Sequence, residues 1–441
     1  MNKSFAASLL AACLSMSAVA QTTDARTDFI TYKIKTGDTF NVFAKKYLQQ
    51  PVDLAALQKH NQLRDINQLA IDSELRIPRH MLKHTLAKAT VMSISCATPI
   101  RMVHSKPLAV GMVLKEGSEI DVPAECHVAL LLEDSSVIRL PSGATLKLTT
   151  LRKNLLESAP EVRLDLSRGR IELDVNKQGR TPSIPFEVRT PISVMGVRGT
   201  EFRVGYSPDD KAGQVEVLGG VVETKGTADS ESRAITSGLG VPVDGQGKAL
   251  AIEKLLPPPL FASAQATQGN NPSYVVQLHP VPQAEYYVAN HAATANLSGT
   301  RGTENLLAPE VFVPRLTKQA VFYQLTSVSP SGLVGTEHYY AFCASPSEPA
   351  MTRCGAMFDA PLADNAPIVF SLSRVNDGQT QAIVRTKTLQ AKNGRFTVQG
   401  LPAGHYQWQL SYDLPTSPSS TASDTTVRQS GTFELIALPV R

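Results

Sequence analysis

The stretch that decides the fold of the N-terminal part reads YKIKTGDTF at residues 32–40, and LRIP at residues 75–78 is its counterpart. In the first segment hydrophobic and basic residues alternate with period two, which indicates a half-buried strand. Gly37 and Asp38 are turn residues, and Asp38 or Thr39 can cap a helix that follows. The second segment indicates a returning strand that ends at its proline.

Two short helical patterns separate these strands. Phe40, Phe43 and Tyr47 recur at the spacing of a helix face, and Pro51 breaks that pattern. Asp53 can cap a second helix. The sequence therefore predicts the order strand, helix, helix, strand within about 50 residues.

This arrangement, over residues 31–79, resembles the LysM module, a small glycan-binding domain of cell-wall proteins. The resemblance implies binding of glycans that contain N-acetylglucosamine, such as peptidoglycan, in a groove between the loop from the first strand to the first helix and the loop from the second helix to the second strand. Such neutral sugars need backbone donors and acceptors and an apolar floor rather than charge. The matching positions are Gly37, Asp38, Thr39 and Phe40 in the first loop, Asn61 at the end of the second helix, and Ala70, Ile71 and Asp72 in the second loop.

The second loop departs from the family pattern. The family usually has Pro-Gly where this chain has Ile71 and Asp72. An aspartate adopts the left-handed backbone conformation less readily than glycine. A LysM fold without affinity for sugar is the alternative to the glycan-binding interpretation.

The N-terminus has the pattern of a secretory signal over residues 1–20, with a basic residue, a short apolar run and small residues before the expected cleavage after Ala20. Cys13 also fits a lipoprotein cleavage box, although the signal would then be unusually short. No other apolar run is long enough for a transmembrane span. We expect a periplasmic or otherwise extracytoplasmic protein.

The charge balance excludes a strongly basic protein. The chain has 43 Lys and Arg against 39 Asp and Glu, and loss of Lys3 with the signal leaves 42 against 39, a net charge of +3. A nucleic-acid partner needs a dense basic face, so none is expected.

Four cysteines follow the expected signal, which allows three disulfide pairings. Pairing of neighbours, Cys96 with Cys126 and Cys343 with Cys354, is the simplest, and unpaired buried thiols are the alternative. The sequence has no Cys-x-x-Cys and its histidines are scattered, so a metal site is not expected.

Residues 91–255 alternate with period two in short segments separated by glycine, which predicts an all-β domain. Gly169 is expected to turn the chain between two such strands. The region resembles FecR-type domains, known for periplasmic sensing that controls a sigma factor. That route needs a cytoplasmic segment and a membrane span, and we expect neither in this sequence. The resemblance therefore implies the fold and not the signalling role. The segments that carry it are VALLLEDSSV (128–137), VRLDLSRG (162–169), PFEVRTP (185–191), VRGTEFRV (197–204) and VEVLGGVV (215–222).

Two further β modules are expected after a proline-rich linker at residues 256–271. Residues 272–345 resemble a fibronectin type III β-sandwich through PVPQAEYYV (280–288) and the segment 321–333. Residues 355–441 indicate a C-terminal β module. The fold class is therefore a mainly β multidomain protein with a small α+β module at its start.

The chain lacks G-x-S-x-G, H-E-x-x-H and P-loop motifs, and no cofactor is expected. We therefore predict a non-catalytic scaffold, held to peptidoglycan by the LysM module, whose β domains bind an envelope protein. The alternatives are a FecR-type sensor that acts through a membrane partner and a LysM-targeted cell-wall hydrolase.

Overall fold

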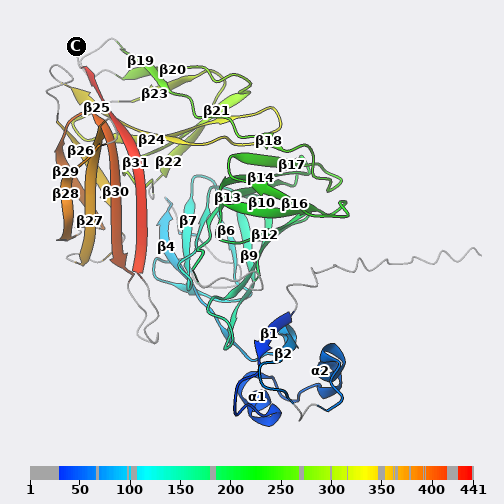
Figure 1. The fold of residues 1–441 in the computed structure, drawn as a ribbon. Coiled ribbons are helices and arrows are strands. Elements are labelled where there is room, and N and C mark those ends of the chain that lie inside the picture. Colours follow the sequence, from blue (N-terminus) through cyan, green and yellow to red (C-terminus); the bar gives the residue numbers. More distant parts are fainter. Residues whose placement is uncertain are drawn as a thin grey trace, which may run out of the picture. The chain divides into compact units, whose positions relative to one another are not determined.

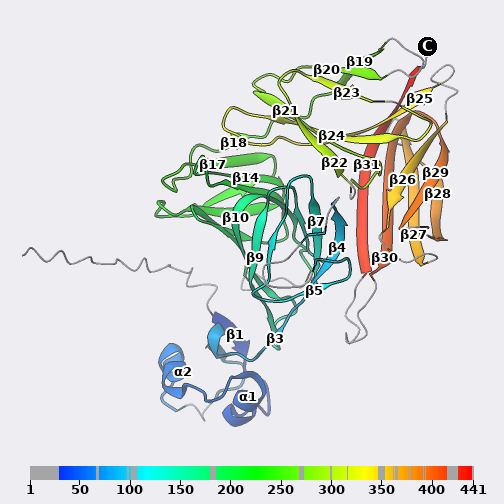
Figure 2. The same cartoon turned by 180° about the vertical axis from the view of Figure 1, so that it is seen from behind.

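The computed structural model (Figure 1, and from behind in Figure 2) contains two compact units, Met1–Leu82 and Lys83–Arg441. The expected signal and Cys13 lie outside the described residues. The structure describes residues 29–65, 69–96, 99–100, 107–178, 185–267, 273–297, 300–314, 316–345, 353–360, 362, 366–376, 379–390, 392, 394–414 and 426–439.

The first unit has the expected order of strand, helix, helix and strand. Its two strands pair antiparallel, with Tyr32 opposite Leu75. The side-chain oxygens of Thr39 and Asp53 cap the two helices by accepting hydrogen bonds from the backbone N–H groups of Val42 and Ala56, at 3.4 and 2.9 Å. The elements are β1 (Phe29–Lys33), α1 (Phe40–Tyr47), α2 (Leu54–Asn61), β2 (Glu74–Pro78) and the short 3-10 helix η1 (Arg79–Met81).

The first part of the second unit is one hydrogen-bonded network of strands that coincides broadly with the expected all-β region. Its central path runs β16-β15-β12-β11-β10-β13-β14-β17-β18. The strands are β3 (His84–Leu86), β4 (Ala89–Ser95), β5 (Val113–Leu114), β6 (Glu119–Asp121), β7 (His127–Leu132), β8 (Val137–Leu140), β9 (Thr145–Asn154), β10 (Glu161–Asp174), β11 (Phe186–Thr190), β12 (Ser193–Val197), β13 (Glu201–Ser207), β14 (Ala212–Gly219), β15 (Val221–Gly226), β16 (Arg233–Thr236), β17 (Leu239–Val243) and β18 (Glu253–Lys254).

The long strand β10 organises this network, and it corrects one prediction. The chain was expected to reverse at Gly169, but β10 continues through it. Its first half pairs with β9 and β11, and its second half pairs with β8 and β13. Gly169 has φ +83°, and a Cβ there would lie 2.6 Å from the Cα of Ala144. The glycine therefore permits a close approach to Ala144, where the strand changes direction. It does not form a hairpin turn.

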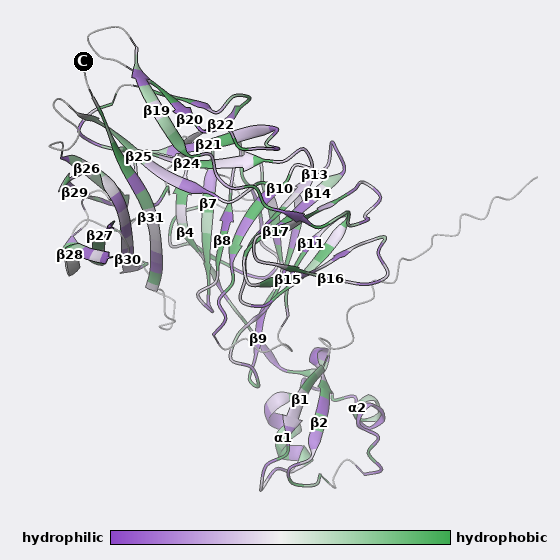
Figure 3. Ribbon diagram, turned by 45° about the horizontal axis from the view of Figure 1, so that its top comes forward, coloured by the Kyte–Doolittle hydropathy of each residue, from purple (hydrophilic) through white to green (hydrophobic). Residues whose placement is uncertain are grey.

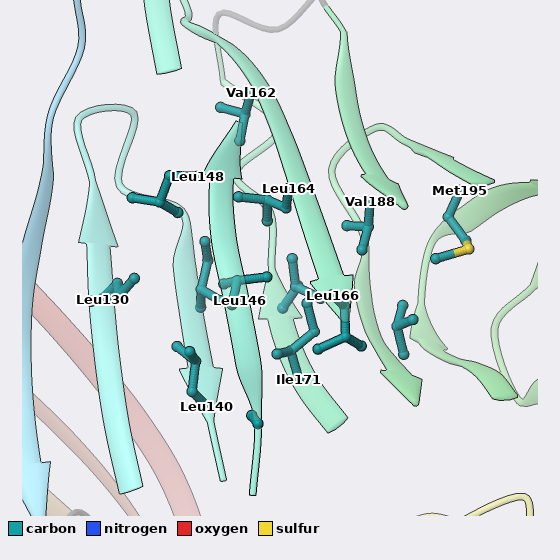
Figure 4. Packing of buried hydrophobic residues seen from close by; sticks show 14 of the residues in the cluster. Leu130, Leu140, Leu146, Leu148, Val162, Leu164, Leu166, Ile171, Val188 and Met195 are labelled. Atoms are coloured by element: carbon teal, nitrogen blue, oxygen red, sulfur yellow. The ribbon is translucent and has the colours of Figure 1, made fainter. Parts of the chain in front are cut away.

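The inward side chains of these strands form one apolar core. Figure 4 shows the packing of leucines from β7, β8, β9 and β10 with Val188 and Met195 of the neighbouring strands. Individual strands carry both hydrophobic and hydrophilic residues (Figure 3), as expected where only one face of a strand is buried.

The remainder of the second unit is built on one eight-stranded sheet with the order β22-β21-β24-β25-β31-β30-β27-β28. Each of two smaller sheets packs against strands of this sheet through its own apolar cluster, so the region forms two sandwiches. The smaller sheets are β19-β20-β23 and β26-β29. The strands are β19 (Phe261–Ala266), β20 (Tyr274–Leu278), β21 (Tyr286–Ala292), β22 (Thr300–Leu306), β23 (Glu310–Val313), β24 (Val321–Val328), β25 (His338–Ser345), β26 (Cys354–Asp359), β27 (Pro367–Asn376), β28 (Gln379–Gln390), β29 (Arg395–Leu401), β30 (Gly404–Asp413) and β31 (Thr426–Pro439).

The segments expected as modules 272–345 and 355–441 share this sheet, because β25 pairs parallel with β31. The expected linker 256–271 is wrong over part of its length, since β19 pairs with β20 there and Phe261 packs against the core. Its proline-rich start suggested a spacer, but a strand follows. The mostly β fold with a small α+β unit at the start is confirmed.

The FecR-like strands and the first sandwich meet in a buried junction of charges. Glu216 of β14 is fully buried and accepts hydrogen bonds from Arg170 at 2.7 Å and from the backbone N–H of Val334 at 3.0 Å. Arg203 of β13, also buried, donates to Glu337 at 2.6 Å. The loop between β24 and β25 is thus held against β13 and β14.

Candidate functional site

The first loop of the N-terminal unit is shaped by Asp38. Its carboxylate accepts hydrogen bonds from the hydroxyl of Tyr32 and from the backbone N–H of Lys35, both at 2.8 Å. The Lys35 N–H, followed by the Tyr32 hydroxyl, lowers the pKa of Asp38. Burial, reinforced by Asp38, raises the pKa of Tyr32 to about 12. Asp38 therefore fixes the loop and has one oxygen already engaged.

Asn61 has a positioning role. Its side chain forms two hydrogen bonds with the backbone of Arg76, accepting from the N–H at 2.6 Å and donating to the C=O at 2.7 Å. It also donates to the C=O of Leu57 at 2.9 Å. The side chain thus links the end of α2 to β2, and both of its N–H groups and its oxygen are engaged by backbone groups.

The second loop is held next to the first by the backbone. The N–H of Asp72 donates to the C=O of Ile34, and the N–H of Ile34 donates to the C=O of Ser73, both at 2.9 Å. Asp72 has φ +66°, the left-handed conformation that glycine favours, so the aspartate takes the geometry of the family's glycine. Its carboxylate forms an exposed ion pair with Lys33 at 2.9 Å, which contributes little to stability.

The predicted positions Gly37 and Thr39 in the first loop and Ile71 in the second are exposed to solvent. Ile71 has 58% of its surface exposed, so its side chain is accessible to a ligand. Thr39 is also exposed, and no other described residue accepts a hydrogen bond from the backbone N–H of Thr39 or Ile71. Gly37, at φ +88°, has no heavy atom within 4 Å of a Cβ position. The two loops thus present one exposed apolar side chain and two backbone donors that no described residue accepts.

The remaining predicted positions have other roles. Phe40 is buried in the core of the unit, as its helical spacing implies, so its ring cannot form the floor of an open groove. The C=O of Ala70 accepts hydrogen bonds from both the N–H and the hydroxyl of Ser73, at 3.2 and 2.6 Å. Ser73 was not predicted, and only its place after the turn residue could have pointed to it.

The structure contains disulfides between Cys96 and Cys126 and between Cys343 and Cys354. The first joins the ends of β4 and β7, and the second joins β25 to β26. Within the described ranges no group of three or more His, Cys, Asp or Glu is placed to hold a metal ion. Among the same residues no helix is long and apolar enough to cross a membrane.

Family models match two parts of the chain. The LysM domain model matches residues 32–78 and the FecR protein model matches residues 118–223. The chain therefore carries a LysM domain and a FecR domain, as the sequence predicted. Both are binding or regulatory domains, and they point to an envelope or extracytoplasmic location. No curated protein matches the chain.

Solved structures give more distant likenesses. A candidate anti-sigma factor from Parabacteroides distasonis is 23% identical with a TM-score of 0.26, and the match covers 31% of this chain and 59% of that protein. A segment of two fibronectin type III domains from chicken tenascin is 10% identical with a TM-score of 0.15, covering 40% of this chain and 99% of that one. At these scores the likenesses say nothing about function.

Proposed function

We propose that this chain, which carries a LysM and a FecR domain, is a non-catalytic scaffold that binds peptidoglycan through its LysM domain and an envelope protein through its β domains. The observation that supports anchoring is the pair of adjoining loops. They present the exposed side chain of Ile71 and the backbone N–H groups of Thr39 and Ile71, for which no described residue is an acceptor. An acetamido group needs this combination, because its methyl packs on an apolar surface and its carbonyl accepts a hydrogen bond.

Retention on purified peptidoglycan sacculi tests the proposal. The experiment uses residues 21–441, since the expected signal is not part of the secreted form. Replacing Ile71 by alanine removes three carbons from the proposed contact, which costs about 1–2 kcal/mol when partly buried by ligand. That corresponds to binding weaker by roughly a factor of 5 to 30.

The matched control is Leu155→Ala, because Leu155 is 61% exposed and lies in the other unit. We expect native-like retention for this variant. Absence of retention of the native chain, or equal retention of the Ile71 variant, would contradict glycan binding at these loops. Clearing of a sacculus suspension by the native chain would instead favour the hydrolase alternative.

A regulatory sensor that acts through a membrane partner is the second candidate, and the FecR match over residues 118–223 favours it. Cross-linking in cells followed by purification of the chain separates the two candidates. A membrane-embedded regulator as the principal cross-linked protein would favour the sensor, whereas soluble or outer-membrane partners would favour the scaffold.

A further inference from the structure

We propose that the open side of the second sandwich, between β28 and β29, binds an extended acidic polypeptide that adds as a strand to the free edge of β29. This site is independent of the proposed glycan anchoring. Within the described residues β28 pairs only with β27, and β29 pairs with β26 apart from one bridge in the turn that joins β28 to β29. Figures 1 and 2 both place these two strands at the outer side of the sandwich.

The apolar core is incompletely covered on this side. In β26, the inward residues Ala356 and Phe358 are fully buried, whereas their partners in β29, Val398 and Phe396, are only half-buried. The facing sheet repeats this contrast.

In the facing sheet the inward residues of β27, Ile368, Phe370 and Leu372, are fully buried. Opposite Ile368 and Leu372 in β28, Leu389 and Val384 are only half-buried, and the residue paired with Phe370 is Lys387. Among the described residues no further strand pairs with the outer edge of β28 or β29 to cover these inward side chains, and an added strand with alternating apolar residues would supply that cover.

A cleft of about 630 Å³ opens where the two strands meet. Its apolar wall consists of Met357, Leu389 and Phe396, and Lys392 and Arg395 contribute its cationic groups. Strand β29 also alternates correctly for an added strand, since Arg395, Thr397 and Gln399 face outward and are exposed. The site thus offers a backbone ladder and an apolar trough together.

The charge of this surface favours an acidic polypeptide. From residue 379 to residue 401 the sequence contains no Asp or Glu. Asp359 of β26 lies opposite Arg395 and is paired with it at 2.7 Å, so Lys392 is the cleft cation that no described carboxylate pairs with. An acidic strand would gain favourable electrostatics here, and a basic one would be repelled.

Fluorescence anisotropy with residues 21–441 tests the proposal. The probe is a fluorescein-labelled decapeptide that alternates valine with glutamate, and the two comparison peptides are valine alternating with lysine and an all-glutamate decapeptide. We expect the valine–glutamate peptide to bind at least about tenfold more tightly than either one, because only it has both the apolar row and the negative charge.

Charge reversal at the exposed Lys392, as Lys392→Glu, should weaken binding of this peptide about five- to tenfold. The same reversal at exposed Lys254 in β18 is the matched control and should leave binding unchanged. Hydrogen exchange of the amides of β29 should slow in the bound state, because strand addition occupies them.

Three results would overturn the inference. If the all-glutamate peptide binds as tightly, the surface binds anions without strand addition. If the valine–glutamate peptide binds without slower exchange in β29, it sits elsewhere. If it does not bind at all, the edge is closed to strands.

Discussion

Glu216 holds the FecR-like strands and the first sandwich together, so its removal should lower the stability of both. The substitution Glu216→Ala leaves the N–H of Val334 buried without its acceptor, which costs about 1–3 kcal/mol. It also deprives Arg170 of its carboxylate partner. Loss of one member of a buried ion pair typically costs about 3–5 kcal/mol in all, and we expect a total in this range.

The single tryptophan makes the assay specific. Trp408 lies in β30, in the sandwich region, whereas the substitution lies in β14. Urea unfolding followed by Trp408 fluorescence therefore reports whether damage in the FecR-like strands reaches the sandwiches. With a denaturant slope of about 3 kcal/mol per molar, the midpoint should fall by roughly 1–1.7 M.

The control is Glu223→Ala in β15, where the glutamate is exposed, and the expected change is under about 0.5 kcal/mol. If the Trp408 transition of the Glu216 variant coincides with that of the native chain, the sandwiches unfold independently of the FecR-like strands. The reasoning about the junction would then be wrong.

Two other substitutions test local features. Asp72→Val places a β-branched residue at φ +66° and should destabilise the second loop by about 1–2 kcal/mol, measured as faster hydrogen exchange over residues 69–78. The control is Asp72→Asn, because asparagine tolerates this conformation and should exchange like the native chain. Equal exchange of the native chain and both variants would show that the conformation is unimportant. The hydrogen bond from His338 at 3.3 Å lowers the pKa of Glu434 below its usual 4.5, so its stabilising effect is present above that value and is lost as the pH falls through the lowered pKa. Unfolding monitored at pH 7 and pH 3 should show a smaller loss of stability for Glu434→Gln than for the native chain, and an equal or larger loss would contradict this assignment.

The sequence was sufficient to predict the local structure of the first unit. The predicted caps, Asp53 and either Asp38 or Thr39, and the spacing of Phe40 and Phe43 are signals between near neighbours. The structure has both helices where they indicate, with Thr39 as the first cap. The role of Asn61 was not predictable in the same way. Its clamp on Arg76 depends on how α2 packs against β2, and the chemistry of an asparagine does not specify that partner.

In the second unit the period-two pattern predicted strands but not their partners. A pattern of alternation shows which face of a strand is buried, yet it is the same for an antiparallel neighbour and for a distant parallel one. The continuation of β10 through Gly169 involves a close approach to Ala144 that a side chain would block, and the contact of Arg203 with Glu337 joins residues far apart in the chain. Neither has a local signature.

The parallel pairing of β25 with β31 has a consequence for how the polypeptide reaches its native state. Tyr340 lies opposite Glu434, so this pairing bridges residues separated by most of a hundred positions. The two halves of the eight-stranded sheet cannot join until β31 has been synthesised. This pairing forms slowly, because closing so long a loop costs conformational entropy before its stabilising contacts form. Until then both halves of the sheet expose unpaired strand edges. We therefore expect nascent chains that stop short of β31 to aggregate.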